Sequence, residues 1–183
     1  MAVTVLRFQI TFHGPVRVGR GRAAPGVDDT VDPGVIIPGS SLKGLMRAEA
    51  TALGLAPTLV DSVFGRGRAQ SPWHWGDVVA GSAEVRVGTR IRKDDESGTA
   101  VEGGMFAAEF RWPETATFEI RRFDALSDED LRRHETVLWA SALAVHSVGA
   151  DRNRGFGWVD LQRVDPPSED LASSVLALAG AMR

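Results

Sequence analysis

The sequence predicts an α+β fold in which two helices pack on one face of an antiparallel sheet. Apolar and polar residues alternate along residues 2–13, as expected for a strand with one buried face. Residues 40–54 and 127–149 instead repeat apolar side chains at helical spacing. With the other predicted strands, the order is strand, helix, several strands, helix, strand. This order predicts a ferredoxin-like sheet with an inserted β-hairpin.

Composition and charge limit the class of protein. The 183 residues are 43% apolar and 25% charged, as in a soluble globular protein, and cysteine is absent, which excludes disulfides and thiolate metal sites. No apolar run is long enough to cross a bilayer, so we expect a cytoplasmic protein with no membrane partner. Residues 1–93 carry a net +5 and residues 94–183 a net −8, which leaves room for a local basic surface.

The first strand leads into a loop, residues 14–35, that is long for a compact domain. Arginines in it could clamp phosphate, and aspartates could hold Mg²⁺ or act as a base. A solvated loop without a role is the alternative. The charged residues are Arg17, Arg20, Arg22, Asp28, Asp29 and Asp32.

Residues 37–47 predict an extended segment, a turn and a helix that is capped by Ser40 or Ser41. Lys43 and Arg47, four residues apart, share a basic face of that helix. A helix N-terminus with serine hydroxyls and a nearby lysine suits an anion. A capped helix that simply packs on the sheet is the alternative.

The middle of the chain carries arginines and aromatic residues. Residues 64–68 predict a turn with exposed arginines, and Trp73 and Trp75 flank His74. These three rings could stack on bases, although packing in the core or at an edge is the commoner use of tryptophan. Residues 84–93 predict a strand with Arg90 on a basic face, which suits a phosphate backbone or a charged edge strand.

The last third of the chain predicts two more strands, at 105–110 and 115–122, a helix from 127, and a glycine- and arginine-rich loop at 149–157 that enters a final strand. Residues 154–161 nearly fit the RNP1 signature of RRM domains. The fold of those domains is also a ferredoxin-like sheet, so the predicted fold can equally be called RRM-like. A leucine stands where an aromatic is expected, and the strand follows the last long helix. A simple RRM-like RNA-binding protein is therefore an alternative. The tail, 165–183, predicts a short helix or a frayed end.

A closer resemblance is to the RAMP superfamily, and within it to the backbone subunits of type III CRISPR effector complexes. Residues 37–44, which read IPGSSLKG, with Arg47, resemble the most recognisable stretch of that family. Residues 149–157 resemble its glycine-rich loop, and residues 90–118 its hairpin "thumb". The resemblance implies one RRM-like domain over 1–164, with the thumb at about 84–122 and a tail at 165–183.

The resemblance also implies a function. These subunits stack along a guide RNA, and their thumbs insert between guide and target RNA and flip out a nucleotide. In active members, an aspartate in the loop before the IPGSSLKG stretch cuts the target RNA with a divalent metal. The implied partners are guide RNA (crRNA), target RNA, further copies of the chain or related RAMP subunits, and other subunits of the effector complex.

Residues 26–29 best match that loop, which makes Asp28 the first candidate for the catalytic, Mg²⁺-binding residue and Asp29 the second. The ribose 2′-hydroxyl can act as the nucleophile, so a bound metal and in-line geometry suffice. An RNA-binding subunit without nuclease activity, and a guide-processing endonuclease with His13 as its base, are alternatives. The expected RNA-binding residues are Arg20, Arg22, Ser40, Ser41, Lys43, Arg47, Arg90, Arg152 and Arg154.

Overall fold

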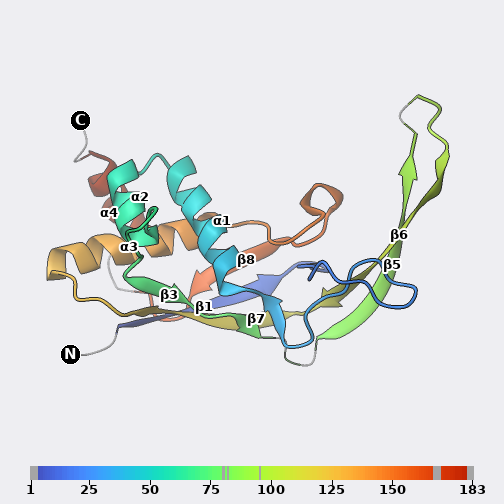
Figure 1. Cartoon of the computed structure of the whole chain (residues 1–183). Helices are drawn as coiled ribbons and strands as arrows, with labels where there is room; N and C mark the ends of the chain where they lie inside the picture. The colour runs from blue at the N-terminus through green and yellow to red at the C-terminus, as the bar shows by residue number, and fades with distance from the viewer. Residues whose placement is uncertain (1–3, 80, 82, 95, 167–169, 181–183) are drawn as a thin grey trace.

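A four-stranded antiparallel sheet forms the centre of the computed structural model, which describes residues 4–79, 81, 83–94, 96–166 and 170–180 (Figure 1). Strand β1 (Val5–Phe12) lies between β7 (Thr115–Arg122) and β8 (Val159–Arg163), and β3 (Trp73–Trp75) pairs with the far side of β7. A helical segment follows β1 and another follows β7. The predicted ferredoxin-like fold is confirmed. The first two residues of the predicted first strand lie outside the described residues.

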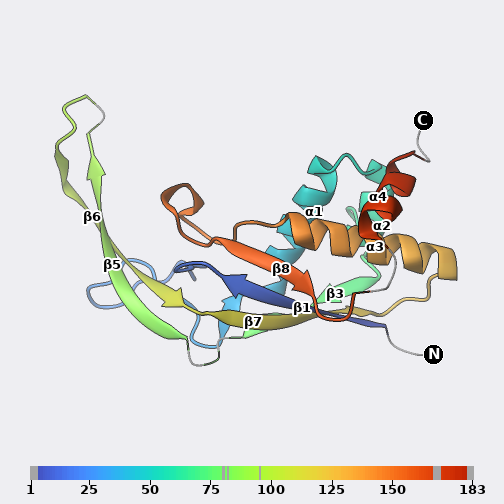
Figure 2. The same cartoon turned by 180° about the vertical axis from the view of Figure 1, so that it is seen from behind.

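The helices cover one face of this sheet, and the opposite face carries none of the described helices (Figures 1 and 2). Two long helices are predicted, and the residues that the structure describes also contain two short ones. Of these, α4 lies in the tail, where a short helix or a frayed end is predicted, and α2 holds too few turns to show a clear period. None of the described helices has the length and apolar character needed to cross a membrane. The helices are α1 (Gly39–Ala52), α2 (Pro57–Phe64), α3 (Asp128–Ala144) and α4 (Leu171–Gly180).

The core lies between the sheet and its helices. Alternate residues of β1 are buried, including Leu6, Phe8 and Ile10, as the sequence pattern predicts. Phe8 stacks on Phe118 of β7 with ring centroids 5.3 Å apart. Burial of each such side chain stabilises the fold by about 1.5–3 kcal/mol.

His134 belongs to this core and lies on the buried face of the helix that the apolar spacing of residues 127–149 predicts. Its Nδ1 accepts a hydrogen bond from Trp73 Nε1, at 3.1 Å, and its Nε2 lies 3.1 Å from Ser62 Oγ. Burial lowers the pKa of His134. Because both ring nitrogens are engaged, the neutral imidazole pins α3 to β3 and α2.

A long hairpin of β5 (Glu84–Lys93) and β6 (Ala100–Trp112) projects from the end of the sheet (Figures 1 and 2). The predicted hairpin, 84–122, is too long at its C-terminal end, because β7 pairs with β1 in the main sheet. Alternation of residues marks a strand but does not identify its partner. At the base of the hairpin, buried Arg111 donates to the carbonyl oxygens of Asp32 and Pro33 at 2.6 and 2.9 Å.

Candidate functional site

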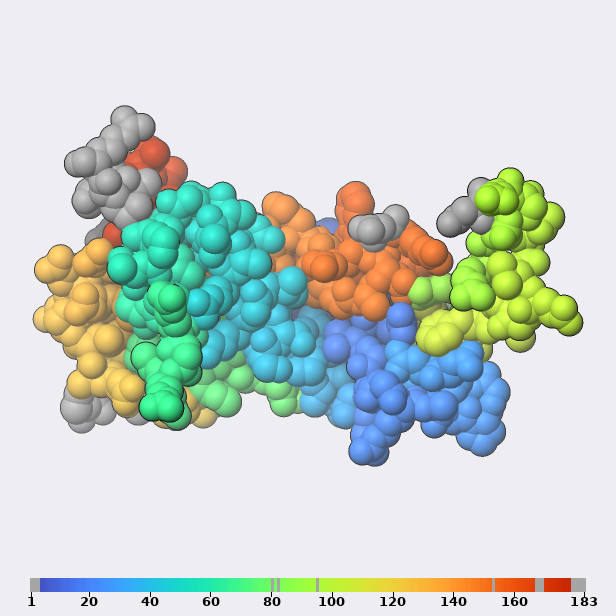
Figure 3. Space-filling model, turned by 45° about the horizontal axis from the view of Figure 1, so that its top comes forward, coloured from blue at the N-terminus to red at the C-terminus, as the bar shows by residue number. Residues whose placement is uncertain are grey.

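Three segments meet on one face of the molecule (Figure 3): the start of α1, the aspartate loop (residues 14–34) and the glycine loop (residues 149–157). The N–H of Ala150 donates to the carbonyl of Arg17 at 2.8 Å, which ties the glycine loop to the aspartate loop. A hollow of about 360 Å³ lies between the aspartate loop and the start of α1, and it is lined by residues that include Arg20, Arg22 and Pro38. The aspartate loop therefore lies between the start of α1 and the glycine loop, and it is hydrogen-bonded to the glycine loop.

Close backbone contacts fix the shape of the glycine loop. A Cβ on Gly157, whose φ is 69°, would lie 1.9 Å from the carbonyl oxygen of Val148, so only glycine fits there. The loop continues through a single 3₁₀ turn, Arg152–Arg154, that leaves the side chains of Arg152 and Arg154 exposed. The two predicted RNA-binding arginines of the glycine loop thus lie on a turn that faces solvent.

The start of α1 differs from the prediction. The helix begins at Gly39 and its N-cap is Pro38, so neither Ser40 nor Ser41 is the cap. The Gly39 N–H donates to Asp77 Oδ1 at 2.7 Å, and a Cβ at this glycine would lie 2.2 Å from the carbonyl oxygen of Trp75. Close packing against the segment after β3 therefore starts the helix early, and a carboxylate already occupies its first amide.

Lys43 and Arg47 follow on α1, as predicted, but they differ in their partners. Arg47 donates to the carbonyl of Gly65 and to Asp61 Oδ1, both at 2.6 Å, and so braces α1 against α2. Lys43 Nζ lies over the ring of Trp75, 5.3 Å from its centroid. Burial, followed by the charge of Arg47, lowers the pKa of Lys43. The negative charge of an added anion would oppose both effects, because it favours the protonated amine.

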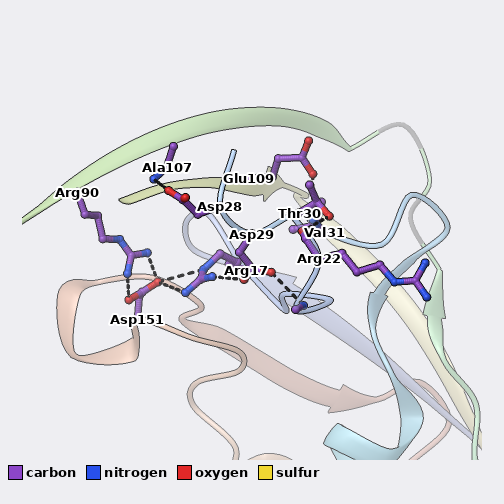
Figure 4. Close-up of polar contacts among 11 residues, drawn as sticks. Arg17, Arg22, Asp28, Asp29, Thr30, Val31, Arg90, Ala107, Glu109 and Asp151 are labelled. Atoms are coloured by element: carbon purple, nitrogen blue, oxygen red, sulfur yellow. Dashed lines mark hydrogen bonds and ion pairs between the residues drawn. The ribbon is translucent and has the colours of Figure 1, made fainter. Parts of the chain in front are cut away.

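A network of buried charges ties the hairpin to both loops (Figure 4). Both carboxylate oxygens of Asp151 accept from Arg90 of β5, and its Oδ2 also accepts from Arg17 Nε and Nη2 at 3.3 and 3.2 Å. Arg17 in turn pairs with Asp29. These four side chains are only 11–19% exposed. Arg90, a predicted RNA-binding residue, thus already has a carboxylate partner.

Aromatic rings enclose this network. Phe110 of β6 stacks on Phe156 of the glycine loop with centroids 4.9 Å apart, and the Arg90 guanidinium lies over both rings, 5.4 and 5.9 Å from their centroids. Burial alone raises the pKa of Asp151, but hydrogen bonds and charge from Arg90 and Arg17 outweigh it and lower that pKa. Asp151 is therefore ionised at neutral pH. The pairing of Arg17 with Asp151 has no signal in the sequence, because 134 residues separate the two.

The two candidate aspartates differ in their surroundings. Asp29 is partly buried, pairs with Arg17 and accepts from the Gly21 N–H at 3.1 Å. Asp28 is exposed. Its Oδ2 accepts from the Ala107 N–H at 2.8 Å, and its own N–H donates to the Ala107 carbonyl at the same distance. Asp28 is therefore held at the edge of the hairpin, and its Oδ1 has no hydrogen-bond partner among the described residues.

The other charges of the aspartate loop are less tightly held. Arg20 Nε lies 3.5 Å from Asp32 Oδ2, and the side chain of Arg22 is exposed. Asp32 accepts from the N–H groups of Gly34 and Val35, and the Gly34 bond is the main cause of its lowered pKa. Across the residues that the structure describes, no three His, Asp or Glu side chains gather as a metal site.

This fold, with its inserted hairpin and basic face, defines a ferredoxin-like protein of RRM-like architecture. The sequence profile of the RAMP superfamily matches residues 9–160, and the chain therefore belongs to that superfamily. Two similar solved structures are the Type III-B Cmr-beta in its apo state and the same complex bound to cognate target RNA. A chain in each matches at 12% identity, with TM-scores of 0.65 and 0.66, over 88% of this chain and 97% of the other. No curated protein matches.

Proposed function

We propose that this chain is a backbone subunit of a type III CRISPR effector complex that holds guide RNA and cleaves target RNA through Asp28. Membership of the RAMP superfamily supports the proposal, as does the fold shared with Cmr-beta chains, which have been solved with cognate target RNA. The partners would be guide RNA, target RNA, further copies of this chain or related RAMP subunits, and the other subunits of the complex.

Guide phosphates would lie across the face in Figure 3. The exposed side chains of Arg152 and Arg154 stand on one side of it, and Arg20 and Arg22 stand on the aspartate loop. Arginine forks suit phosphate oxygens, and such contacts carry most of the affinity for a nucleic-acid backbone. Ser40, two residues after Pro38, is also exposed, and its hydroxyl can donate to a phosphate.

The hairpin would act as the wedge between guide and target. The network around Asp151 holds the hairpin at Arg90, so the hairpin would enter the duplex at a set angle. Ile91 and Met105 lie directly opposite each other and are 58% and 67% exposed. These two apolar side chains can contact unstacked bases, whereas Phe106, closer to the base, lies beneath the guanidinium of Arg17.

One observation carries the cleavage proposal: Asp28 presents a free, exposed carboxylate oxygen beside the hairpin, while Asp29 is committed to Arg17. This donor set fits a Mg²⁺ ion shared with RNA phosphates and water, because Mg²⁺ commonly takes only one or two carboxylates from a protein. When bound, such an ion offsets charge on the scissile phosphate. Asp28 would hold it, and the Ala107 N–H would orient the carboxylate.

Asp28→Asn in the assembled complex tests this assignment, because the amide keeps an oxygen for the Ala107 N–H and loses the charge. We expect cleavage of target RNA with Mg²⁺ to fall by about 100-fold or more, with guide and target binding unchanged. Asp29→Asn is the matched control, and complexes that assemble with it should still cut. Full activity in the Asp28 variant, or loss of cutting in the Asp29 variant alone, contradicts the assignment.

An RNA-binding subunit without nuclease activity is the second candidate. The contact of Asp28 Oδ2 with the Ala107 N–H favours it, because this contact gives the carboxylate a structural role between the aspartate loop and the hairpin. It predicts that the unmodified complex binds target RNA and leaves it intact at all Mg²⁺ concentrations, which the same cleavage assay measures.

A further inference from the structure

A second basic hollow lies on the other side of α1, between the first turns of that helix, the turn at residues 65–70 and the segment after β7. Its volume is about 490 Å³, within the range of small-molecule sites. Neither the glycine loop nor the aspartate loop lines it. It is therefore separate from the face proposed for guide phosphates.

Cations line one wall of this hollow. Lys43, Arg47 and Arg66 lie there, and the single carboxylate of Asp61 pairs with both arginines, at 2.6 Å to Arg47 and 3.2 Å to Arg66. The Arg66 side chain is 77% exposed, and Lys43 has no ion pair among the described residues. The wall thus carries an excess of two positive charges, which would attract the single negative charge of an RNA phosphate.

Aromatic rings form the other wall. Phe123 is 70% exposed, unusual for a phenylalanine that follows a strand, and its backbone N–H donates to the Pro72 carbonyl at 2.9 Å. His74 meets the Phe123 ring edge-on, with centroids 5.6 Å apart. Trp73 and Trp75, which the sequence offered as stacking residues, are buried. The aromatic rings available to stack on a base in this hollow are therefore those of His74 and Phe123.

We propose that this hollow binds one nucleotide of single-stranded RNA, with its base against Phe123 and its phosphate at Lys43 and Arg66. An acidic peptide would use the cations but would leave the exposed ring without a partner, whereas a nucleotide uses both walls. The site rests on the proposed function and extends it to a second stretch of RNA. Lys43 is among the RNA-binding residues expected from the sequence, whereas Phe123 and Arg66 are not, so substitutions at these two residues test the hollow separately.

The test is a titration of the full-length chain with a fluorescently labelled oligouridine RNA. Phe123→Leu keeps an apolar side chain but removes the stacking face, and should weaken binding by roughly 5- to 150-fold, whereas Phe123→Trp should bind as tightly as the parent. Arg66→Ala should weaken binding and reduce the salt dependence by the equivalent of about one phosphate contact. Arg132→Ala, an exposed arginine beside α4, is the matched control and should change nothing.

A variant with Arg152→Ala and Arg154→Ala, measured in parallel, separates the two proposals. Weaker binding by Phe123→Leu and Arg66→Ala, together with weaker binding by the glycine-loop variant, supports both sites. If only the glycine-loop variant loses affinity, the second subsite is wrong and the proposed function stands. If only the Phe123 and Arg66 variants lose affinity, the subsite stands and the proposed guide face is wrong. Equal binding by Phe123→Leu and Phe123→Trp overturns the subsite in every case.

Discussion

Replacing Asp151 with asparagine isolates the charge that holds the hairpin in place. The side chain keeps its size, and the residue keeps its left-handed conformation, with φ of 66°, because asparagine adopts that region readily. What is lost is the negative charge between Arg17 and Arg90. The two guanidinium groups would then lie close together with only Asp29 to compensate them.

The expected loss in the free energy of unfolding depends on how deeply these charged side chains are buried. Removing one partner of a fully buried ion pair typically costs about 3–5 kcal/mol. Here the side chains retain 11–19% exposure and Arg17 keeps one carboxylate, so we expect a loss of about 2–3 kcal/mol. For a chain of this length that loss corresponds to a melting temperature lower by roughly 4–12 °C.

Calorimetry measures this change, and hydrogen exchange locates it, because the amides of β5 and β6 should exchange faster once the hairpin is released from the glycine loop at Arg90. Glu84→Gln is the matched control, since it removes an exposed ion pair with Arg86 on the same hairpin and should leave the midpoint unchanged. If Asp151→Asn has the same melting temperature as Glu84→Gln and its hairpin amides keep their protection from exchange, the network does not hold the hairpin.

Three further predictions concern stability and binding. Burial lowers the pKa of His134 below its ordinary 6.5, so the unfolded chain binds the proton more tightly than the folded chain. The free energy of unfolding should therefore fall as the pH drops below 6.5. Melting curves of His134→Gln should show a weaker fall. Gly157→Ala should cost about 2 kcal/mol or more in urea unfolding, whereas Gly21→Ala, which has a similar φ but open space around its Cβ, should cost clearly less. Replacing both arginines of the 3₁₀ turn with alanine should lower the slope of log affinity against log salt by about 1.4, in a filter-binding assay where Arg132→Ala leaves it unchanged.

Much of the fold follows from residue periodicity. The alternation in β1 predicts which side chains are buried, and the stripe that contains His134 predicts the buried face of α3. The start of α1 was predicted wrongly, because serine capping is a local preference and the contact between Gly39 and Asp77 joins residues 38 positions apart. The predicted C-terminal end of the hairpin, at residue 122, was wrong for a similar reason, because β7 pairs with β1 in the main sheet.

The candidate site was predicted in part. The motifs carrying Arg152, Arg154 and Asp28 are local, and the structure leaves these side chains exposed. Sequence alone could not separate Asp28 from Asp29, because the difference arises from the tertiary contact of Asp29 with Arg17. Nor could it show that Arg90 meets a carboxylate of the glycine loop.

The most direct test of the proposed function is purification of the tagged chain from its native host, followed by sequencing of the bound RNA and mass spectrometry of the bound proteins. The proposal predicts guide RNA derived from a CRISPR array, together with further RAMP subunits in fixed proportion. A chain that is recovered alone, or with RNA unrelated to any array, would contradict it.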